Sequence, residues 1–187
     1  NVPERYRQLD PRDAMLKALD DGIGRIVAAL EAHEFSENTL LVFTNDNGPV
    51  LEEMSKPYRG TKNTTFEGGV RSPCLVRWPG HTEAGTKNDG MMFVADWFST
   101  LISIAVGSYK QTSMVDALDM SEMLFQGKVS PRTEIAYDVS GSVRLPTLRS
   151  GDFKLMGDML FNIIQDPSEQ SDIASKHPEI VSKMKKR

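Results

Sequence analysis

An apolar run that ends at a polar turn constrains this chain more than any other feature. Residues 40–43 suit a strand buried on both faces, and residues 45–49 cannot continue a strand. Open α/β sheets place their ligands at the carboxyl ends of such strands. Asp46 and Asn47 offer two hard oxygen ligands there, which would suit Ca²⁺ or Mg²⁺ better than Zn²⁺. The alternative is a polar turn in which both side chains bond to their own backbone.

The composition of the chain limits its fold and its partners. Its 187 residues suffice for one ordinary domain or slightly more, and 39% hydrophobic with 26% charged residues indicate a packed core. The net charge of −4 argues against a groove for nucleic acid. No apolar run approaches the ~20 residues of a membrane span. The first residue is Asn1 rather than Met, so we expect a processed product or a fragment.

Helix and strand patterns alternate in the first two thirds of the sequence. Pro11 opens a segment with an apolar stripe at helical spacing, and Asp10 is its expected cap. Residues 74–78 predict a second short buried strand, and residues 93–105 predict an apolar helix that ends at a glycine. This order is typical of a mainly parallel sheet between helices. We assign this α/β part to residues 1–128.

The last third of the sequence, residues 129–187, has a different pattern. It contains four short strand candidates, separated by turns at the spacing of antiparallel hairpins. The strand candidates are residues 134–139, 143–148, 153–156 and 160–164, and the turns are residues 140–141, 151–152 and 157–158. Pro178 then opens a closing helix. We therefore predict a small antiparallel four-stranded sheet with a C-terminal helix.

A series of short motifs follows along nearly the whole chain. They are Leu19-Asp20-x-x-Ile23-Gly24, Thr44-Asn45-Asp46-Asn47-Gly48, Tyr58-Arg59-Gly60-Thr61-Lys62, Phe66-Glu67-Gly68-Gly69-Val70-Arg71-Ser72-Pro73, Asp96-Trp97-Phe98-Ser99-Thr100-Leu101, Leu148-Arg149-x-Gly151-Asp152-x-Lys154-Leu155 and Asp166-Pro167-Ser168-Glu169-Gln170. Together they resemble the C-terminal half of the sulfatase family. One such motif would be weak, but several in order at family-like spacing are specific.

This resemblance implies a fold, an activity and site residues. The fold is of the alkaline-phosphatase kind, a large mixed, mainly parallel sheet between helices followed by a four-stranded antiparallel subdomain. The activity is hydrolysis of sulfate esters, whose leaving group is an aryl alcohol or a glycan. Asp46 and Asn47 would bind one Ca²⁺, with Mg²⁺ as the alternative, and Lys62 would contact the sulfate. The related phosphatases have a histidine where Asn47 stands, and an oxygen ligand favours the harder cation.

The resemblance also implies parts that we expect outside this chain. The nucleophile of the family is a formylglycine, made from Cys or Ser in a Cys/Ser-x-Pro-x-Arg motif far upstream. Cys74-Leu75-Val76-Arg77 lacks the proline and has its arginine one place early, so we interpret Cys74 as a small core residue of a strand. Two metal-binding aspartates and the residues that act on the leaving group are also expected upstream. We therefore expect the N-terminal half of the same protein as the partner of this chain, which alone would be inactive.

Two other functions stay open on the sequence. One is hydrolysis of phosphoric or phosphonic esters, because sulfate and phosphate are both tetrahedral oxyanions. The other is binding of sulfated glycans by a truncated, non-catalytic homologue. Arg59 would either pair with a sulfate or form a salt bridge with a carboxylate such as Glu67. Family resemblance implies a lysosomal, secreted or periplasmic location, and Asn63 begins a glycosylation sequon that we expect to stay unmodified beside Lys62.

Overall fold

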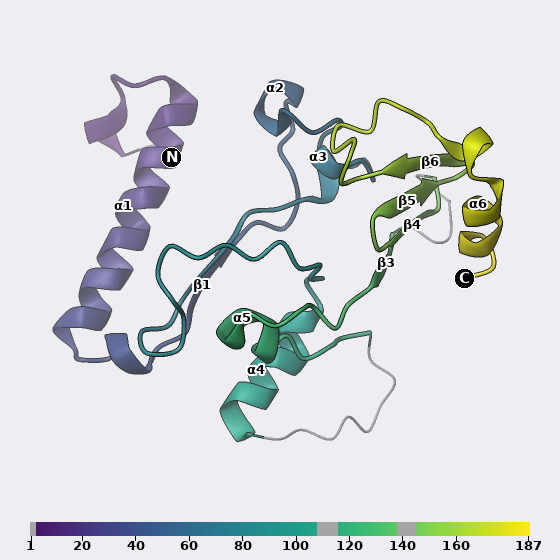
Figure 1. Ribbon diagram of the computed structural model, residues 1–187. Helices are drawn as coiled ribbons and strands as arrows, with labels where there is room; N and C mark the ends of the chain where they lie inside the picture. The colour runs from purple at the N-terminus through teal and green to yellow at the C-terminus, as the bar shows by residue number, and fades with distance from the viewer. Residues whose placement is uncertain (1–2, 108–115, 138–144) are drawn as a thin grey trace. The chain divides into compact units, whose positions relative to one another are not determined.

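The computed structural model describes residues 3–107, 116–137 and 145–187, which form two compact units (Figure 1). The first unit holds the described residues within 1–42 and 76–85, and the second holds those within 43–75 and 86–187. The elements in chain order are η1 (Glu4–Tyr6), α1 (Pro11–Ala32), η2 (Ser36–Asn38), β1 (Leu41–Thr44), α2 (Glu52–Ser55), α3 (Glu67–Val70), β2 (Cys74–Arg77), α4 (Asp96–Val106), α5 (Ser121–Gln126), β3 (Glu134–Tyr137), β4 (Thr147–Ser150), β5 (Phe153–Met156), β6 (Met159–Asn162), η3 (Ala174–Lys176) and α6 (Pro178–Met184).

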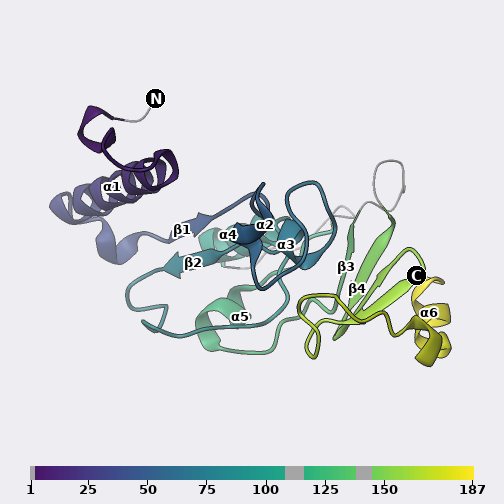
Figure 2. The same cartoon turned by 90° about the horizontal axis from the view of Figure 1, so that it is seen from above.

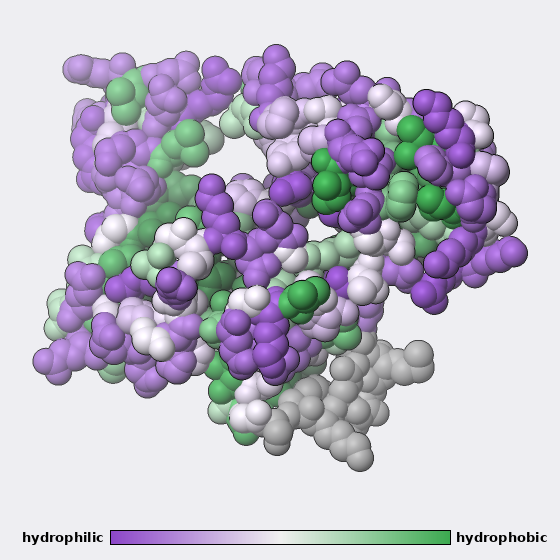
Figure 3. Space-filling model, in the orientation of Figure 1, coloured by the Kyte–Doolittle hydropathy of each residue, from purple (hydrophilic) through white to green (hydrophobic). Residues whose placement is uncertain are grey.

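Helix α1 dominates the first unit and begins as the sequence predicts. Asp10 caps it by accepting a hydrogen bond from the Arg12 backbone N–H at 3.0 Å, and Pro11 occupies the first helical position. Its apolar stripe is nonetheless exposed, with Leu16 58% and Ile26 55% accessible. Figure 3 shows hydrophobic atoms among hydrophilic ones along this helix. None of the helices in the described ranges has the length and apolar character to cross a membrane.

Strands β1 and β2 form a two-stranded sheet among the described residues. The prediction of two strands at these positions is confirmed. The prediction that both are buried is wrong for this structure, because Leu41, Val42 and Phe43 are only half-buried while Cys74 and Leu75 are exposed. Each strand has one hydrogen-bonded neighbour here, so an edge and part of its faces remain uncovered.

A buried ion pair organises the helical part of the second unit. Asp96, the first residue of α4, accepts two hydrogen bonds from the guanidinium of Arg132, at 2.6 and 2.8 Å. Its carboxylate also accepts from the backbone N–H groups of Phe93 and Leu118, so four donors share one buried charge. Helix α4 ends at Gly107 with φ of 82°, which confirms the predicted glycine stop.

The second unit ends in an antiparallel sheet of order β3-β4-β5-β6, as predicted (Figure 2). Gly151 and Gly157, in the two tight turns, have the positive φ that such turns require. Strand β4 runs over 147–150 rather than 143–148. Residues 143–144, the end of the first predicted strand and the predicted turn at 140–141 lie outside the described residues.

The two faces of strand β5 have different partners, because successive side chains of a strand point to opposite faces. Leu155 packs with Leu160 and with Met184 of α6, and this cluster forms the hydrophobic core of the sheet. Lys154 and Met156 point to the other face, and both are buried as well. The sheet is therefore covered on both sides at β5, by α6 on one side and by charged partners of Lys154 on the other.

Candidate functional site

The predicted metal ligands follow the end of β1. Thr44 anchors that end, because its hydroxyl donates a hydrogen bond to the Pro73 carbonyl oxygen at 2.9 Å. Asp46 is exposed, and Asn47 is half-buried. The amide nitrogen of Asn47 donates to the Gly48 carbonyl oxygen at 2.8 Å. Neither its amide oxygen nor the Asp46 carboxylate accepts a hydrogen bond from another of the described residues.

Gly48 packs this turn against the glycine pair Gly68–Gly69. Its N–H donates to the Gly69 carbonyl oxygen at 2.9 Å. A Cβ atom on Gly48 would lie 1.8 Å from the Gly68 carbonyl oxygen, which is far inside van der Waals contact. The two backbones therefore approach so closely that only glycine fits at this position. The Glu67-Gly68-Gly69 segment belongs to the one-turn helix α3.

The close approach at Gly48 leads to a stability prediction. Gly48→Ala forces the two backbone segments apart, and we expect it to lower the free energy of unfolding by about 1–3 kcal/mol or more. Gly24→Ala is the matched control, since Gly24 is exposed in α1 and a Cβ there would meet nothing within 4 Å. That control should stabilise the chain by about 0.5–1 kcal/mol through helix propensity. Equal unfolding midpoints in urea for the two variants would contradict the close contact.

Lys62 and the predicted metal ligands lie on one continuous segment, residues 46–62, which we call the Asp46–Lys62 frame. The Lys62 N–H donates to the Pro49 carbonyl oxygen at 2.7 Å, which fixes Lys62 beside the turn that begins at Asp46. The loop that carries it is closed by Thr64, whose hydroxyl donates to the Thr61 carbonyl oxygen at 2.7 Å. The Lys62 side chain is exposed, and within the described ranges its ammonium has neither a hydrogen-bond nor an ion-pair partner. Such a cation is accessible to an anionic ligand.

The chemistry of these groups fits a hard cation bound next to an oxyanion. A carboxylate and an amide oxygen are ligands that Ca²⁺ accepts, whereas Zn²⁺ prefers nitrogen and sulfur. Two ligands are fewer than the six to eight oxygens that Ca²⁺ takes. Among residues 3–107, 116–137 and 145–187, no three His, Cys, Asp or Glu side chains gather as a metal site would require. Asp46 and Asn47 are therefore too few to complete a Ca²⁺ site by themselves.

A buried charge cluster, which the sequence analysis did not predict, lies behind this frame. It consists of Glu67, Arg149, Lys154 and Glu169. The ammonium of Lys154 lies 3.0 Å from Glu67 Oε1 and 2.9 Å from Glu169 Oε1, and the three side chains are at most 2% exposed. The contact between the Lys154 ammonium and Glu169 Oε1 is an ion pair without the geometry of a hydrogen bond. Burial raises the pKa of the Glu169 carboxyl, and Lys154 opposes that rise.

Arg59 has a protein partner other than the predicted carboxylate of Glu67. Its guanidinium donates to the Glu169 backbone carbonyl oxygen at 3.0 Å and lies over the Phe66 ring at 4.1 Å from the centroid. Glu67 instead pairs with Lys154, with Arg149 at 3.4 Å and more loosely with Arg71 at 3.8 Å. The predicted Arg59–Glu67 salt bridge is therefore wrong, because strand β5 supplies a nearer and fully buried cation.

Two residues in segments that match the nucleophile motif partly or by letters also have clear positions. Cys74 is exposed in β2, so the prediction of a strand residue is confirmed and that of a core residue is wrong. Residues 55–59, Ser-Lys-Pro-Tyr-Arg, match the letters of Cys/Ser-x-Pro-x-Arg. Ser55, however, is 5% exposed, and its hydroxyl lies 2.9 Å from the Glu52 and 3.2 Å from the Tyr58 carbonyl oxygens. Ser55 closes a turn, so the nucleophile is still expected outside this chain.

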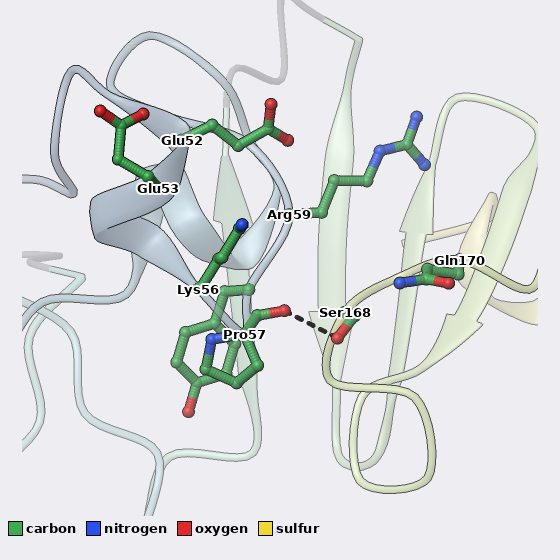
Figure 4. A pocket seen from close by; sticks show the side chains of 8 residues that line it. Glu52, Glu53, Lys56, Pro57, Arg59, Ser168 and Gln170 are labelled. Carbon is green, nitrogen blue, oxygen red and sulfur yellow. Dashed lines mark hydrogen bonds between the residues drawn. The ribbon is translucent and has the colours of Figure 1, made fainter.

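A shallow groove of about 510 Å³ lies beside the cluster, between α2 and the turn after β6 (Figure 4). Its lining residues are Glu52, Glu53, Lys56, Pro57, Tyr58, Arg59, Ser168 and Gln170. The Ser168 hydroxyl donates to the Pro57 carbonyl oxygen at 2.7 Å and joins the two walls. Acidic and basic side chains are mixed, and Asp46, Asn47 and Lys62 are not among them. This groove is therefore separate from the predicted sulfate position.

Comparison with known proteins decides the family. The sequence model of the Sulfatase family matches residues 1–108, which is more than half of the chain. The chain belongs to the sulfatase family. This sulfatase chain is 27% identical to arylsulfatase J of Mus musculus, over 93% of the chain and 38% of that protein. It is 35% identical to N-acetylgalactosamine-6-sulfatase of Sus scrofa, over 65% of the chain and 24% of that protein.

Solved sulfatases share the fold of this sulfatase chain. The crystal structure of the PsFucS1 sulfatase from Pseudoalteromonas sp. superposes on it with a TM-score of 0.79 at 26% identity. The match covers 97% of this chain and 44% of that one. The sulfatase chain thus spans less than half the length of each of these three proteins. The four-stranded antiparallel sheet and the C-terminal helix described above belong to this shared fold.

Proposed function

We propose that this chain supplies part of the active site of a sulfatase that hydrolyses sulfate esters. The observation that carries the proposal is the hydrogen bond from the Lys62 N–H to the Pro49 carbonyl oxygen. It places the backbone of Lys62, whose ammonium has no ion-pair partner among the described residues, beside the turn that carries Asp46 and Asn47 in a chain of the sulfatase family. This arrangement suits a cation and a sulfate group bound next to each other.

In this proposal each residue has one role. Asp46 and Asn47 hold a Ca²⁺ through their side-chain oxygens, with Mg²⁺ as the alternative ion. A divalent cation supplies Lewis-acid polarisation of a sulfate oxygen when it is bound. Lys62 neutralises charge on the ester as that charge shifts in the transition state, which is where an electrostatic contact accelerates a reaction. The formylglycine nucleophile belongs to another part of the site, and no residue described here replaces it.

The proposed partner of this chain is the remaining part of the sulfatase fold. The exposed apolar side chains of α1, such as Leu16 and Ile26, and the exposed Leu75 of β2 support this proposal, because covering apolar side chains by a partner removes them from water. They suit a mixed, mainly parallel sheet covered by helices. Residues 1–128 would complete that α/β domain and residues 129–187 form the small C-terminal domain.

A sulfated sugar is the proposed substrate class, with an aryl sulfate as a convenient probe. The name of N-acetylgalactosamine-6-sulfatase, which is 35% identical over part of the chain, supports a sulfated sugar. The position of the sulfate on the sugar is left open, because the residues described here contact only the shared sulfate group in this proposal.

The proposal that this chain supplies only part of the active site predicts that the isolated chain is inactive. The 187-residue chain should release no measurable aryl alcohol from an aryl sulfate, because the Ser55 hydroxyl is buried in a turn and the described site residues supply only two ligands of the cation. The same chain, joined to a sulfatase N-terminal part with Cys-x-Pro-x-Arg, should hydrolyse that ester. Turnover by the chain alone would contradict this proposal. A well-folded joined protein without turnover would favour the non-catalytic alternative.

A further inference from the structure

We propose that the C-terminal sheet β3–β6 positions the Asp46–Lys62 frame through the buried side chain of Glu67. The importance of this positioning for catalysis rests on the function proposed above. The coupling between the sheet and the frame does not depend on that function. The coupling runs from Lys154 and Glu169 to Glu67, and from the backbone of α3 to the turns that carry Asp46 and Lys62. Each of these steps is a contact between residues of the second unit.

The first step is that the sheet needs the Glu67 carboxylate between two of its cations. Arg149 of β4 and Lys154 of β5 are direct cross-strand partners, and two cations in such a pair repel each other. Glu67 relieves this repulsion, since its Oε2 lies 3.4 Å from Arg149 and its Oε1 lies 3.0 Å from Lys154. Lys154 is fully buried, so loss of the carboxylate would leave an ammonium with one remaining anionic partner. The sheet therefore fixes the position of Glu67.

The second step fixes the backbone of Glu67 as well as its side chain. The Glu169 carboxylate accepts a hydrogen bond from the Glu67 N–H at 2.6 Å. Glu169 is itself held from the site side, because Arg59 donates to its backbone carbonyl oxygen at 3.0 Å. Both anions of the cluster are thus tied to the loop that contains Lys62. The cluster has two anions and two cations, so it carries no net charge.

The third step transmits this position to the site through backbone contacts without flexible side chains. The Gly68 N–H donates to the Arg59 carbonyl oxygen at 2.8 Å. The Gly69 carbonyl oxygen accepts from Gly48, next to the proposed ligand Asn47. Cβ atoms on Gly68 or Gly69 would lie within 2.6 Å of carbonyl oxygens of the loop, so these segments pack backbone against backbone. A shift of Glu67 must therefore move Gly48.

Positioning by Glu67 should act on the Asp46–Lys62 frame, whereas a general loss of stability would not act there specifically. A second buried ion pair serves as the control for this difference. Asp96 and Arg132 form a second buried ion pair, with side chains 0% and 5% exposed. That pair joins α4 to residues 116–134 and has no contact with the Asp46–Lys62 frame in the described structure. If Glu67 is a positioning residue, its loss should disturb Gly48 and Lys62, whereas an equal loss of stability at Asp96 should not.

The test is amide hydrogen exchange measured residue by residue by NMR on a complete sulfatase that contains this chain. In Glu67→Gln we expect the amides of Gly48 and Lys62 to exchange at least about tenfold faster and to shift their resonances, while the Leu118 amide does not change. In Asp96→Asn we expect the reverse, because the Leu118 N–H donates to Asp96. Unchanged exchange at Gly48 and Lys62 in Glu67→Gln would overturn the proposal.

A second variant keeps the test decisive if Glu67→Gln does not fold. Glu67→Gln combined with Lys154→Met removes one anion and one cation, so it leaves no unbalanced charge in the buried cluster. Faster exchange at Gly48 and Lys62 in this variant supports positioning by Glu67, and wild-type exchange overturns it. Glu67→Asp, which keeps the charge, should restore part of the protection. Exchange does not require turnover, so failure of this proposal and failure of the sulfatase function are separate results.

Discussion

Asp46→Ala is expected to abolish both Ca²⁺ retention and sulfate-ester hydrolysis in a complete sulfatase that contains this chain. Asp46 is the only carboxylate in the proposed ligand pair, and its side chain is exposed after the end of β1. Loss of a charged ligand should weaken cation binding by about 10²-fold or more, since even changes around metal ligands cost up to that factor. Metal content after desalting and turnover of an aryl sulfate measure the two effects.

The control for this prediction is Asp89→Ala. Asp89 is also an exposed aspartate, but it lies in the loop before α4. It should retain metal content and turnover like the unmodified protein. An Asp46→Ala enzyme with normal metal content and activity would show that Asp46 belongs to a polar turn, which is the alternative stated for this segment.

Lys62→Ala is expected to lower kcat/KM by about 10²-fold, since the loss of one electrostatic contact in the transition state costs ~3 kcal/mol. The melting temperature should change little. The side chain is exposed and has no ion-pair partner in the described part of the chain, and its backbone bond to Pro49 does not depend on the side chain. Initial rates with an aryl sulfate, together with a melting curve, separate the two quantities.

Lys87→Ala is the matched control, because Lys87 is likewise an exposed loop lysine. Its rates should equal those of the unmodified enzyme. Lys62→Ala should lose rate with the sulfate ester whether or not excess Ca²⁺ is added, because the role proposed for Lys62 is separate from retention of the ion. Near-normal turnover would leave Lys62 as a solvated loop residue.

Local sequence signals predicted the elements of this fold better than they predicted burial. Pro11 at the start of α1, Gly107 at the end of α4 and the glycines of the β-hairpins determine backbone geometry in their own neighbourhood, so each could be interpreted directly. Burial depends on what packs against an element. The apolar residues of β1 predicted a buried strand, but with β2 as its described neighbour that strand is half-buried.

The candidate site shows the same division between local and distant signals. Asp46, Asn47 and Lys62 lie in short motifs that resemble those of a family, so they could be named from the sequence. Glu67 and Lys154 are separated by 87 positions, and no local pattern joins them. The available signal was a lysine placed among apolar residues in the predicted strand 153–156, where a buried cation requires an anionic partner.

The two faces of β5 also limit how the gene can change in length. Leu155 contacts the core against α6, whereas Lys154 contacts the carboxylates on the opposite face. A single-codon insertion or deletion in the turn at Gly151 could shift the register of β5 by one residue. The ammonium of Lys154 would then point into the hydrophobic core, and Leu155 would point toward the two carboxylates. Length variation in this hairpin should therefore come in steps of two codons, and a library of loop-length variants would reveal that parity.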